Sequence, residues 1–307
     1  MLNGYLNRFI LGLAIAAGAA GCAGPQEKAA QVQSPARENQ MTEADGLAAE
    51  ALAAYHLQRD GARTLNLIAA ATNRAPQRAD LAYLQLALCR AIEGCQPEPY
   101  ETIVRKLEPA NAVVWMRVLE QAQQQRETSV EAHILEAMGR AETFNVHWNE
   151  LVAAITGARI ALGAGANAAL SETVGWLGET IVPSLQPLTH ACARTRTAER
   201  EWAQRCSKLA QVLANADTYV VEALGLKIAQ QVTAEKLEQD RLAQRALTAR
   251  YLWRESGTII ESQVERDKFA LQLVELMRKL RREQDVQLAV VRWAGSPVVP
   301  PRGWTDE

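Results

Sequence analysis

The residues that come closest to a site for acid–base chemistry are His147 and Glu150. At positions i and i+3 of a helix, the imidazole and the carboxylate lie on one face, where they form either a proton-transfer pair or a surface hydrogen bond. The other histidines, His56, His133 and His190, are isolated, and none belongs to a His-Glu-x-x-His pattern. We favour the surface hydrogen bond for His147, and we expect no catalytic residue, no metal site and no cofactor.

Motifs for nucleophiles and nucleotides are also missing from the sequence. It contains no Gly-x-Ser-x-Gly elbow. The segment Gly163-Ala164-Gly165 follows no strand pattern, and no Lys-Ser or Lys-Thr pair comes after it, so it lacks the features of a phosphate-binding loop. These glycines favour close helix packing or a helix break.

Four of the five cysteines form an even set that suits disulfide bonds in an oxidising compartment. Cys192 and Cys206 are 14 residues apart, which is about 21 Å along one unbroken helix, whereas a disulfide needs Cα atoms within about 7 Å. A bridge between them therefore requires a turn at about residues 194–198. Gly94 provides a helix end between Cys89 and Cys95. Of the three possible pairings, we predict the local one, Cys89 with Cys95 and Cys192 with Cys206.

The amino-terminal segment has the layout of a secretory signal. One positive residue, Arg8, precedes an apolar run from Phe9 to Ala20, and small residues then lead directly to Cys22. The apolar run is too short to cross a bilayer as a stable helix. We therefore predict a signal peptide at residues 1–21.

The four residues Ala19-Ala20-Gly21-Cys22 resemble the lipobox of bacterial lipoproteins. This resemblance implies acylation of the Cys22 thiol, cleavage just before it and acylation of the new amino terminus. Several acyl chains make such an anchor effectively permanent. In that family Ala23, which is not a retention residue, implies sorting to the outer membrane, with the chain facing the periplasm. Ordinary secretion, with cleavage after an Ala-x-Ala-like site, is the alternative.

The composition fits a soluble body on that anchor. Of the 307 residues, 48% are hydrophobic and 22% are charged, and the formal net charge of -2 gives no electrostatic reason to expect nucleic acid as a partner. Residues 22–41 are polar with few large apolar side chains, so we predict a tether there. Thr42 and Asp45 have the spacing of a capping box, which predicts that the folded part begins at Thr42.

After the tether, hydrophobic residues recur at helical spacing, and no segment alternates as a strand would. Six short amphipathic stripes precede residue 143, with breaks at Gly61, Pro76, Gly94 and Pro109. A helix with one apolar stripe cannot bury it alone, so neighbouring helices must stack. The predicted fold class is therefore all-α, with stacked antiparallel helical hairpins.

Residues 43–142 also show a loose repeat. Pro76 and Pro109 are 33 residues apart, close to the 34-residue period of tetratricopeptide repeats. Residues 107–115, Leu-Glu-Pro-Ala-Asn-Ala-Val-Val-Trp, resemble the joint between two such repeats. The resemblance implies a solenoid in which the first helix of each pair lines a concave groove, while generic helix pairs with a coincidental period are the alternative. On that resemblance, the candidate partner contacts are the long polar side chains of Gln85, Arg117, Gln121 and Gln124.

The second half of the chain has longer helical stripes. Residues 143–290 are predicted to form a helical bundle, and residues 291–307 an extended, proline-containing tail whose Trp304 docks on the body. A basic group follows the last stripe that we identify, at Arg278, Lys279, Arg281 and Arg282. Cations favour a helix C-terminus, so a solvated helix end is the first interpretation, and contact with anionic lipid headgroups is the second.

These features together predict a non-catalytic binding scaffold for an envelope protein or peptide, anchored in the outer membrane through Cys22. The alternative is an enzyme acting on cell-wall or lipid substrates, with its site in the Ala- and Gly-rich region after residue 145. A deep polar cleft that holds Glu150, Glu172 or Glu179 beside a histidine would favour the enzyme. An open groove would favour the scaffold.

Overall fold

The computed structural model describes residues 38–305. The predicted signal peptide (1–21), Cys22 and the first part of the predicted tether lie outside these residues. The described chain is all-helical, as predicted, and its only strand-like contact is an isolated bridge between Asn111 and Thr143. Within this part of the chain, every helix is too short or too polar to cross a membrane.

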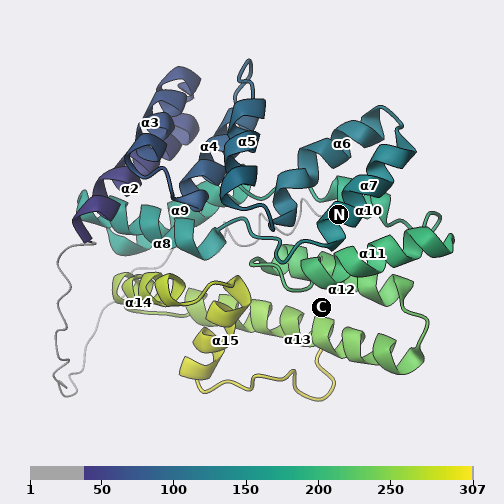
Figure 1. Cartoon of the computed structure of the whole chain (residues 1–307). Helices are drawn as coiled ribbons and strands as arrows, with labels where there is room; N and C mark the ends of the chain where they lie inside the picture. Colours follow the sequence, from purple (N-terminus) through teal and green to yellow (C-terminus); the bar gives the residue numbers. More distant parts are fainter. Residues whose placement is uncertain (1–37, 306–307) are drawn as a thin grey trace.

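The first half of the described chain forms three antiparallel helical hairpins, each joined by a tight turn (Figure 1). A single π-helical turn, Ala54–Gln58, ends the first helix, and a 3₁₀ turn, Ala112–Trp115, starts the fifth. The three pairs are α2 (Glu38–Ala53) with α3 (Gly61–Arg74), α4 (Ala79–Ala91) with α5 (Glu98–Leu107), and α6 (Met116–Gln124) with α7 (Thr128–Gly139).

The second half contains two further hairpins and then the longest helix. The hairpins are α8 (Trp148–Ala161) with α9 (Ala166–Thr180), and α11 (Arg200–Leu213) with α12 (Tyr219–Val232). The short helix α10 (Gln186–Ala191) connects them. The chain ends with α13 (Lys236–Glu261), α14 (Arg266–Lys279) and α15 (Glu283–Trp293).

The helices are arranged in three tiers. In Figure 1 the first three hairpins form the upper tier, α8, α9, α11 and α12 the middle one, and α13 to α15 the lower one. Contacts between the tiers agree with this view, because α2 packs on α8, α7 packs on α11, and α14 packs on both α8 and α9. The second half of the chain therefore covers one side of the first three hairpins.

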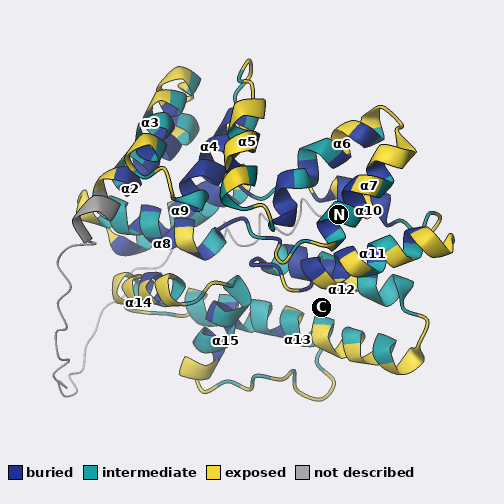
Figure 2. Cartoon of the chain, in the orientation of Figure 1, coloured by how far each residue is buried: buried dark blue, intermediate teal, exposed yellow. Residues whose placement is uncertain are grey.

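One hydrophobic core runs through all three tiers. Its fully buried members extend from Ala44 in α2 to Val290 in α15, and Figure 2 shows the buried surfaces facing the middle tier. Because buried residues from both sides of position 142 belong to the same core, the structure shows no break in the core at the predicted boundary between 142 and 143. The resemblance of residues 43–142 to a tetratricopeptide solenoid stays a prediction.

Local sequence explains where the first hairpin turns. Arg59 adopts a left-handed backbone with φ of 55° and ends the π-helical turn. The carboxylate of Asp60 then accepts a hydrogen bond from the backbone N–H of Arg63 at 2.9 Å, which caps α3. Gly61 follows because a Cβ atom there would lie 2.9 Å from the Ile92 side chain. The predicted break at Gly61 thus has both a cap and a close packing contact.

Two predicted boundaries are wrong. The first helix begins at Glu38, so Thr42 lies inside α2 instead of capping it, and the last residues of the predicted tether, 38–41, are helical. Asp45 is buried and forms an ion pair with Arg78 at 3.1 Å, a role that the capping-box spacing did not indicate.

At the carboxy-terminal end, α15 extends to Trp293, so the predicted tail at 291–307 starts three residues too early. Trp304 docks edge-on against Tyr251, as predicted, with ring centroids 5.5 Å apart.

Both predicted disulfides are present. Cys89 at the end of α4 pairs with Cys95 across the Gly94 turn, and Cys192 pairs with Cys206 of α11, with Cα–Cα distances of 5.3 Å and 5.7 Å. The chain reverses between Cys192 and Arg200, where the distance argument places a turn.

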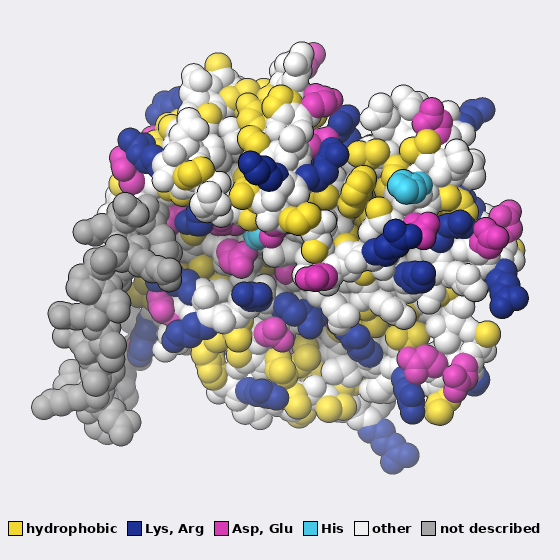
Figure 3. Space-filling model, viewed as in Figure 1, with side chains coloured by type: hydrophobic (Ala, Val, Ile, Leu, Met, Phe, Trp, Pro, Cys, Tyr) yellow, Lys and Arg dark blue, Asp and Glu magenta, His cyan; other side chains and the backbone are white. Residues whose placement is uncertain are grey.

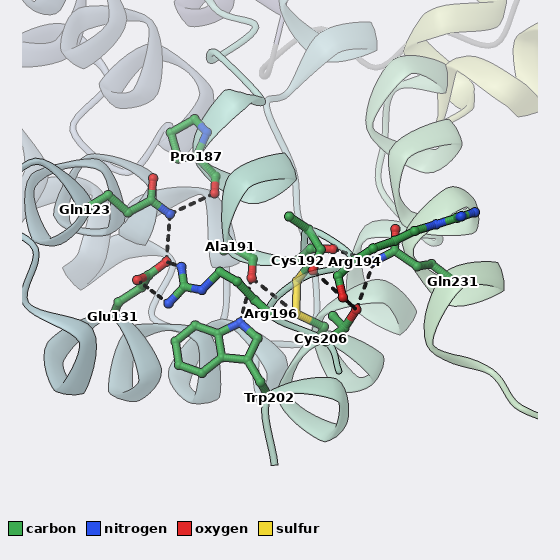
Figure 4. The surroundings of a disulfide bond; sticks show 12 residues. Gln123, Glu131, Pro187, Ala191, Cys192, Arg194, Arg196, Trp202, Cys206 and Gln231 are labelled. Carbon is green, nitrogen blue, oxygen red and sulfur yellow. Dashed lines mark hydrogen bonds and ion pairs between the residues drawn. A yellow bond between two sulfur atoms is a disulfide. The ribbon is translucent and has the colours of Figure 1, made fainter. Parts of the chain in front are cut away.

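The second bridge lies within a network that joins the upper and middle tiers (Figure 4). Arg196 forms a bidentate ion pair with Glu131 of α7 and stacks over the Trp202 ring at 3.9 Å. The Trp202 indole N–H donates to the carbonyl of Ala191 at 2.6 Å. Gln123 of α6 donates to both Glu131 and the Pro187 carbonyl. The third hairpin is thus held to the segment that carries the disulfide.

Replacing Cys192 and Cys206 together by serine is expected to lower the free energy of unfolding by about 3 kcal/mol, because the bridge closes a loop of about 15 residues in the unfolded chain. The same change at Cys89 and Cys95 releases a shorter loop and is expected to cost about 2 kcal/mol. Urea unfolding of both variants beside the oxidised wild type measures the two losses. Unfolding midpoints equal to that of the wild type would contradict the assignment.

Candidate functional site

His147 lies between two carboxylates at the start of α8. Its Nδ1 atom is 2.7 Å from Glu150 Oε2, and its Nε2 atom is 2.8 Å from Glu108 Oε2. The side chain of His147 is only 5% exposed, and its backbone is left-handed with φ of 60°. The predicted contact with Glu150 is therefore present, but it is part of a buried site instead of a surface hydrogen bond.

Neighbouring amides and backbone groups hold this histidine in place. The Asn111 side chain donates to Glu108 Oε2 at 2.9 Å and to the Asn145 carbonyl at 2.8 Å, while its oxygen accepts from the Asn145 N–H at 3.0 Å. The side-chain oxygen of Asn145 accepts from the His147 N–H at 2.8 Å. The carboxylate of Asp217 accepts from the backbone N–H groups of Val146 and Trp148. We call Glu108, Asn111, Asn145, His147 and Asp217 the polar junction.

The charges of the polar junction decide the protonation of His147. Burial alone would lower the pKa of this imidazole, but hydrogen bonds to Glu108 and Glu150, and the charges of these two residues, outweigh it and raise the pKa to about 10. Burial opposes ionisation of Glu108 as well, yet its bond to His147 lowers the pKa of that carboxyl. At neutral pH the site therefore holds an imidazolium between two carboxylates.

An imidazolium held in this way is unsuited to act as a general base or as a metal ligand. A general base needs a pKa near the working pH and a free nitrogen within reach of the substrate, and a histidine that binds a metal must be the neutral imidazole. Both nitrogens of His147 are bonded to carboxylates, and its pKa lies well above neutrality. The site that comes closest to acid–base chemistry in the sequence thus has the properties of a structural ion pair.

A second histidine lies beside the other predicted glutamates. His56 Nε2 is 3.0 Å from Thr180 Oγ1, and its Nδ1 is 3.6 Å from Glu179 Oε2. The ring stacks on Trp176 with centroids 5.7 Å apart, and burial lowers the pKa of the imidazole. Glu172 instead pairs with Arg159. These contacts hold α9 against the end of α2.

Neither His147 nor His56 lines the two concavities found along the last three helices. Two concavities lie along α13, α14 and α15, and the residues around them include no histidine and none of Glu150, Glu172 and Glu179. Within residues 38–305, no group of three or more metal-ligating side chains is suitably placed for an ion. Neither of these two concavities is therefore the polar cleft beside a histidine that would favour an enzyme.

The predicted partner contacts have different environments. Gln85 is wrong as a surface residue, because its side chain is buried and accepts a hydrogen bond from Thr72 at 3.1 Å. Its helix, α4, packs on α3 of the preceding hairpin and also contacts α9, where the Tyr83 hydroxyl donates to the Ile181 carbonyl at 2.9 Å. The Gln85 side chain is therefore engaged between α4 and α3.

Arg117 is engaged inside the fold. Its guanidinium forms a bidentate pair with Glu101, which is 1% exposed and also accepts hydrogen bonds from Arg90 and Arg105. Burial would raise the pKa of Glu101, but the bonds and charges of Arg117 and Arg90 lower it. Arg117 therefore joins the second hairpin to the third, and replacing it would disturb the fold itself.

Gln121 and Gln124 are the two candidates that remain on the surface. Both are exposed on α6, and neither side chain makes a hydrogen bond within the described residues. The opposite face of α6 is fixed, because Met116, Leu119 and Ala122 are buried in the core. The structure thus brings two of the four predicted contacts together on one rigid helix face.

The sequence indicated His147 but not the other members of the polar junction. Glu108 is 39 residues from His147 and Asp217 is about 70 residues away, and the repeat-like stretch 107–115 that contains Glu108 does not indicate its contact with His147. Comparisons with protein-family models, curated proteins and solved structures found no match for this chain.

The raised pKa of His147 predicts a specific pH dependence. Because the folded state holds this proton up to about pH 10, while an unfolded histidine loses it near 6.5, the stabilisation is complete below about pH 6.5 and is lost as the pH rises. Between about pH 7.5 and 9.5 the free energy of unfolding should fall by about 1.4 kcal/mol per pH unit.

Urea unfolding at pH steps across this range measures that slope in the wild type. His147→Gln should remove it, and Glu136→Gln, a change to an exposed carboxylate paired with Arg140, serves as a matched control that keeps it. A wild-type chain whose stability does not change from pH 7.5 to 9.5 would contradict the buried imidazolium.

Proposed function

We propose that this chain is a non-catalytic binding scaffold of the bacterial cell envelope, which holds an envelope protein or peptide on the exposed face of α6. The observation that carries the proposal is the pair Gln121 and Gln124, whose side chains project unpaired from a helix with a buried opposite face. Long amide side chains on a rigid helix can donate and accept hydrogen bonds with a partner backbone. They need little reorganisation to do so.

The chemistry of the described residues supports binding over catalysis. The two histidines that lie beside glutamates serve as packing and ion-pair residues, and His147 has no free nitrogen. The ion pairs around Glu101 and Glu131 also connect helices to one another. An enzyme that used these histidines or glutamates would need a substrate pocket beside them.

The proposed location is the outer membrane, with the chain anchored through lipid on Cys22 and facing the periplasm. It is supported by the lipobox-like residues Ala19-Ala20-Gly21-Cys22 and by two disulfides that join all four remaining cysteines. Structural disulfides persist in oxidising compartments such as the periplasm. Several acyl chains on one cysteine would hold the body permanently at the membrane surface.

The anchor is tested by replacing Cys22 with serine, which removes the thiol that acylation requires. The variant is expected to lose palmitate labelling and to move from the membrane fraction to the soluble fraction of bacterial cells. The control is the double serine variant at Cys89 and Cys95, which should keep both the palmitate label and the membrane location. Unchanged labelling of Cys22→Ser would refute the anchor.

The partner face is tested by replacing Gln121 and Gln124 with alanine together. Exposed polar changes of this kind should alter the free energy of unfolding by no more than about 0.5 kcal/mol each. We expect the folded variant to lose the proteins that crosslink to the wild type in cells. The matched control is Gln204→Ala with Gln211→Ala, two exposed glutamines on α11. Equal crosslinking patterns in both double variants would end the proposal.

A further inference from the structure

An open groove of about 770 Å³ lies between the end of α13, α14 and α15. Its hydrophobic lining includes Ile259, Phe269, Leu271, Leu276, Val290 and Trp293. Leu271 and Trp293 expose 47% and 54% of their surface, and Figure 3 shows hydrophobic side chains gathered in this lower part of the molecule, below α8. Binding pockets for small molecules usually have volumes of about 300–1,000 Å³, so the groove is large enough for such a ligand.

A narrow cavity of about 90 Å³ adjoins the groove. Gln263, Phe269 and Val290 line both spaces, and the cavity continues inward between α9, α14 and α15, past Leu170 and Leu273. An α-helix with its side chains is about 10–12 Å wide, so a partner helix cannot enter this cavity, whereas a chain of methylene groups can. The shape of the two spaces therefore favours an acyl chain over a peptide.

The few polar groups at the inner end are already satisfied. The Glu283 carboxylate accepts hydrogen bonds from the backbone N–H of Tyr219 at 2.7 Å and from the Gln287 side chain at 3.0 Å. The Ser256 hydroxyl donates to the Trp253 carbonyl. Because Glu283, Gln287 and Ser256 already have partners, an apolar chain beside them leaves none of these three side chains unpaired.

The groove is basic at one end. Lys279 lines it, and Arg281 follows at the end of α14. Both side chains are exposed, and neither makes an ion pair or hydrogen bond within residues 38–305. The other two members of the basic group are engaged, because Arg278 pairs with Glu275 and Arg282 donates to the Ala216 carbonyl. One unpaired cation, Lys279, thus lines the groove together with Glu275, which is paired with Arg278, and a second, Arg281, lies two residues further along the chain.

We propose that this groove binds a single anionic lipid, with the acyl chain along α14 and α15 and its end in the inner cavity. The negative headgroup lies at Lys279, with Arg281 beside it. The hydrophobic lining would contact the acyl chain, and the cavity is narrow enough to admit only a slender chain. The unpaired ammonium of Lys279 would attract the negative headgroup. This site is separate from α6, so it goes beyond the scaffold function and does not depend on it.

The proposal is tested with palmitate as the probe and the full chain carrying Cys22→Ser, which brings no acyl chain of its own. Titration calorimetry should show one palmitate bound per chain. Leu271→Glu should weaken binding at least tenfold, because it replaces an apolar contact on the groove wall with a charge. The matched control is Leu162→Glu, a leucine 70% exposed at the end of α8, which should leave palmitate affinity unchanged.

The headgroup contact is tested by comparing palmitate with hexadecanol, a neutral amphiphile with an equally long chain. Lys279→Glu should weaken palmitate binding about two- to fivefold, as expected for a partly exposed ion pair, and leave hexadecanol binding unchanged. Lys268→Glu, on the same helix but outside the groove, should affect neither ligand.

Three results would overturn the proposal. The first is a wild-type groove that binds no palmitate, and the second is binding that Leu271→Glu does not weaken. The third is binding only to vesicles of phosphatidylglycerol and phosphatidylcholine, without a palmitate complex, which would identify the surface as a membrane-docking face. None of these results bears on the α6 face, because its test uses different residues and a protein readout.

Discussion

The polar junction is the constraint on which the rest of the structure depends. Here the loop after α5, the segment before α8 and the turn between α11 and α12 meet inside the protein, where each buried polar group must have a partner. Asp217 caps the first turn of α8, and His147 joins Glu108 to Glu150. The backbone N–H of Glu283 donates to the Asp217 carbonyl at 2.8 Å, which brings the start of α15 to the same place. The three tiers are therefore joined through a buried set of charges and amides as well as through the hydrophobic core.

Local sequence predicted the helices and the disulfides because short-range physics determines both. Apolar spacing shows where each stripe lies, and Gly61, Gly94 and Pro109 mark breaks that the structure confirms. The pairing of Cys192 with Cys206 followed from distance along a helix, which requires a turn between them. Boundaries at the two ends were less predictable, because the start of α2 and the end of α15 carry no cap signal that separates them from their flanks.

Long-range packing decided what the sequence did not indicate. Gln85 is buried where α4 packs on α3, and its amide oxygen accepts a hydrogen bond from Thr72. Arg117 is engaged because its guanidinium pairs with Glu101 on the neighbouring hairpin. Glu108 and Asp217 partner the α8 start across dozens of residues. In each case the residue type is compatible with either an exposed or a buried position. Packing against another helix determines which of the two occurs. The groove along α14 and α15 likewise depends on the packing of three helices, α13, α14 and α15, and no separate stripe was identified in the sequence for α15.

The structural role of His147, the histidine nearest to acid–base chemistry, rests on its two bonds to carboxylates. It is tested most directly by following the ¹⁵N chemical shifts of the His147 ring from pH 5 to 10.5. We expect both ring nitrogens to stay protonated through neutral pH and to titrate at about pH 10, with Glu108 and Glu150 as partners. A neutral imidazole at pH 7 that titrates near its ordinary pKa of about 6.5 would contradict this account and return His147 to the candidates for a catalytic base.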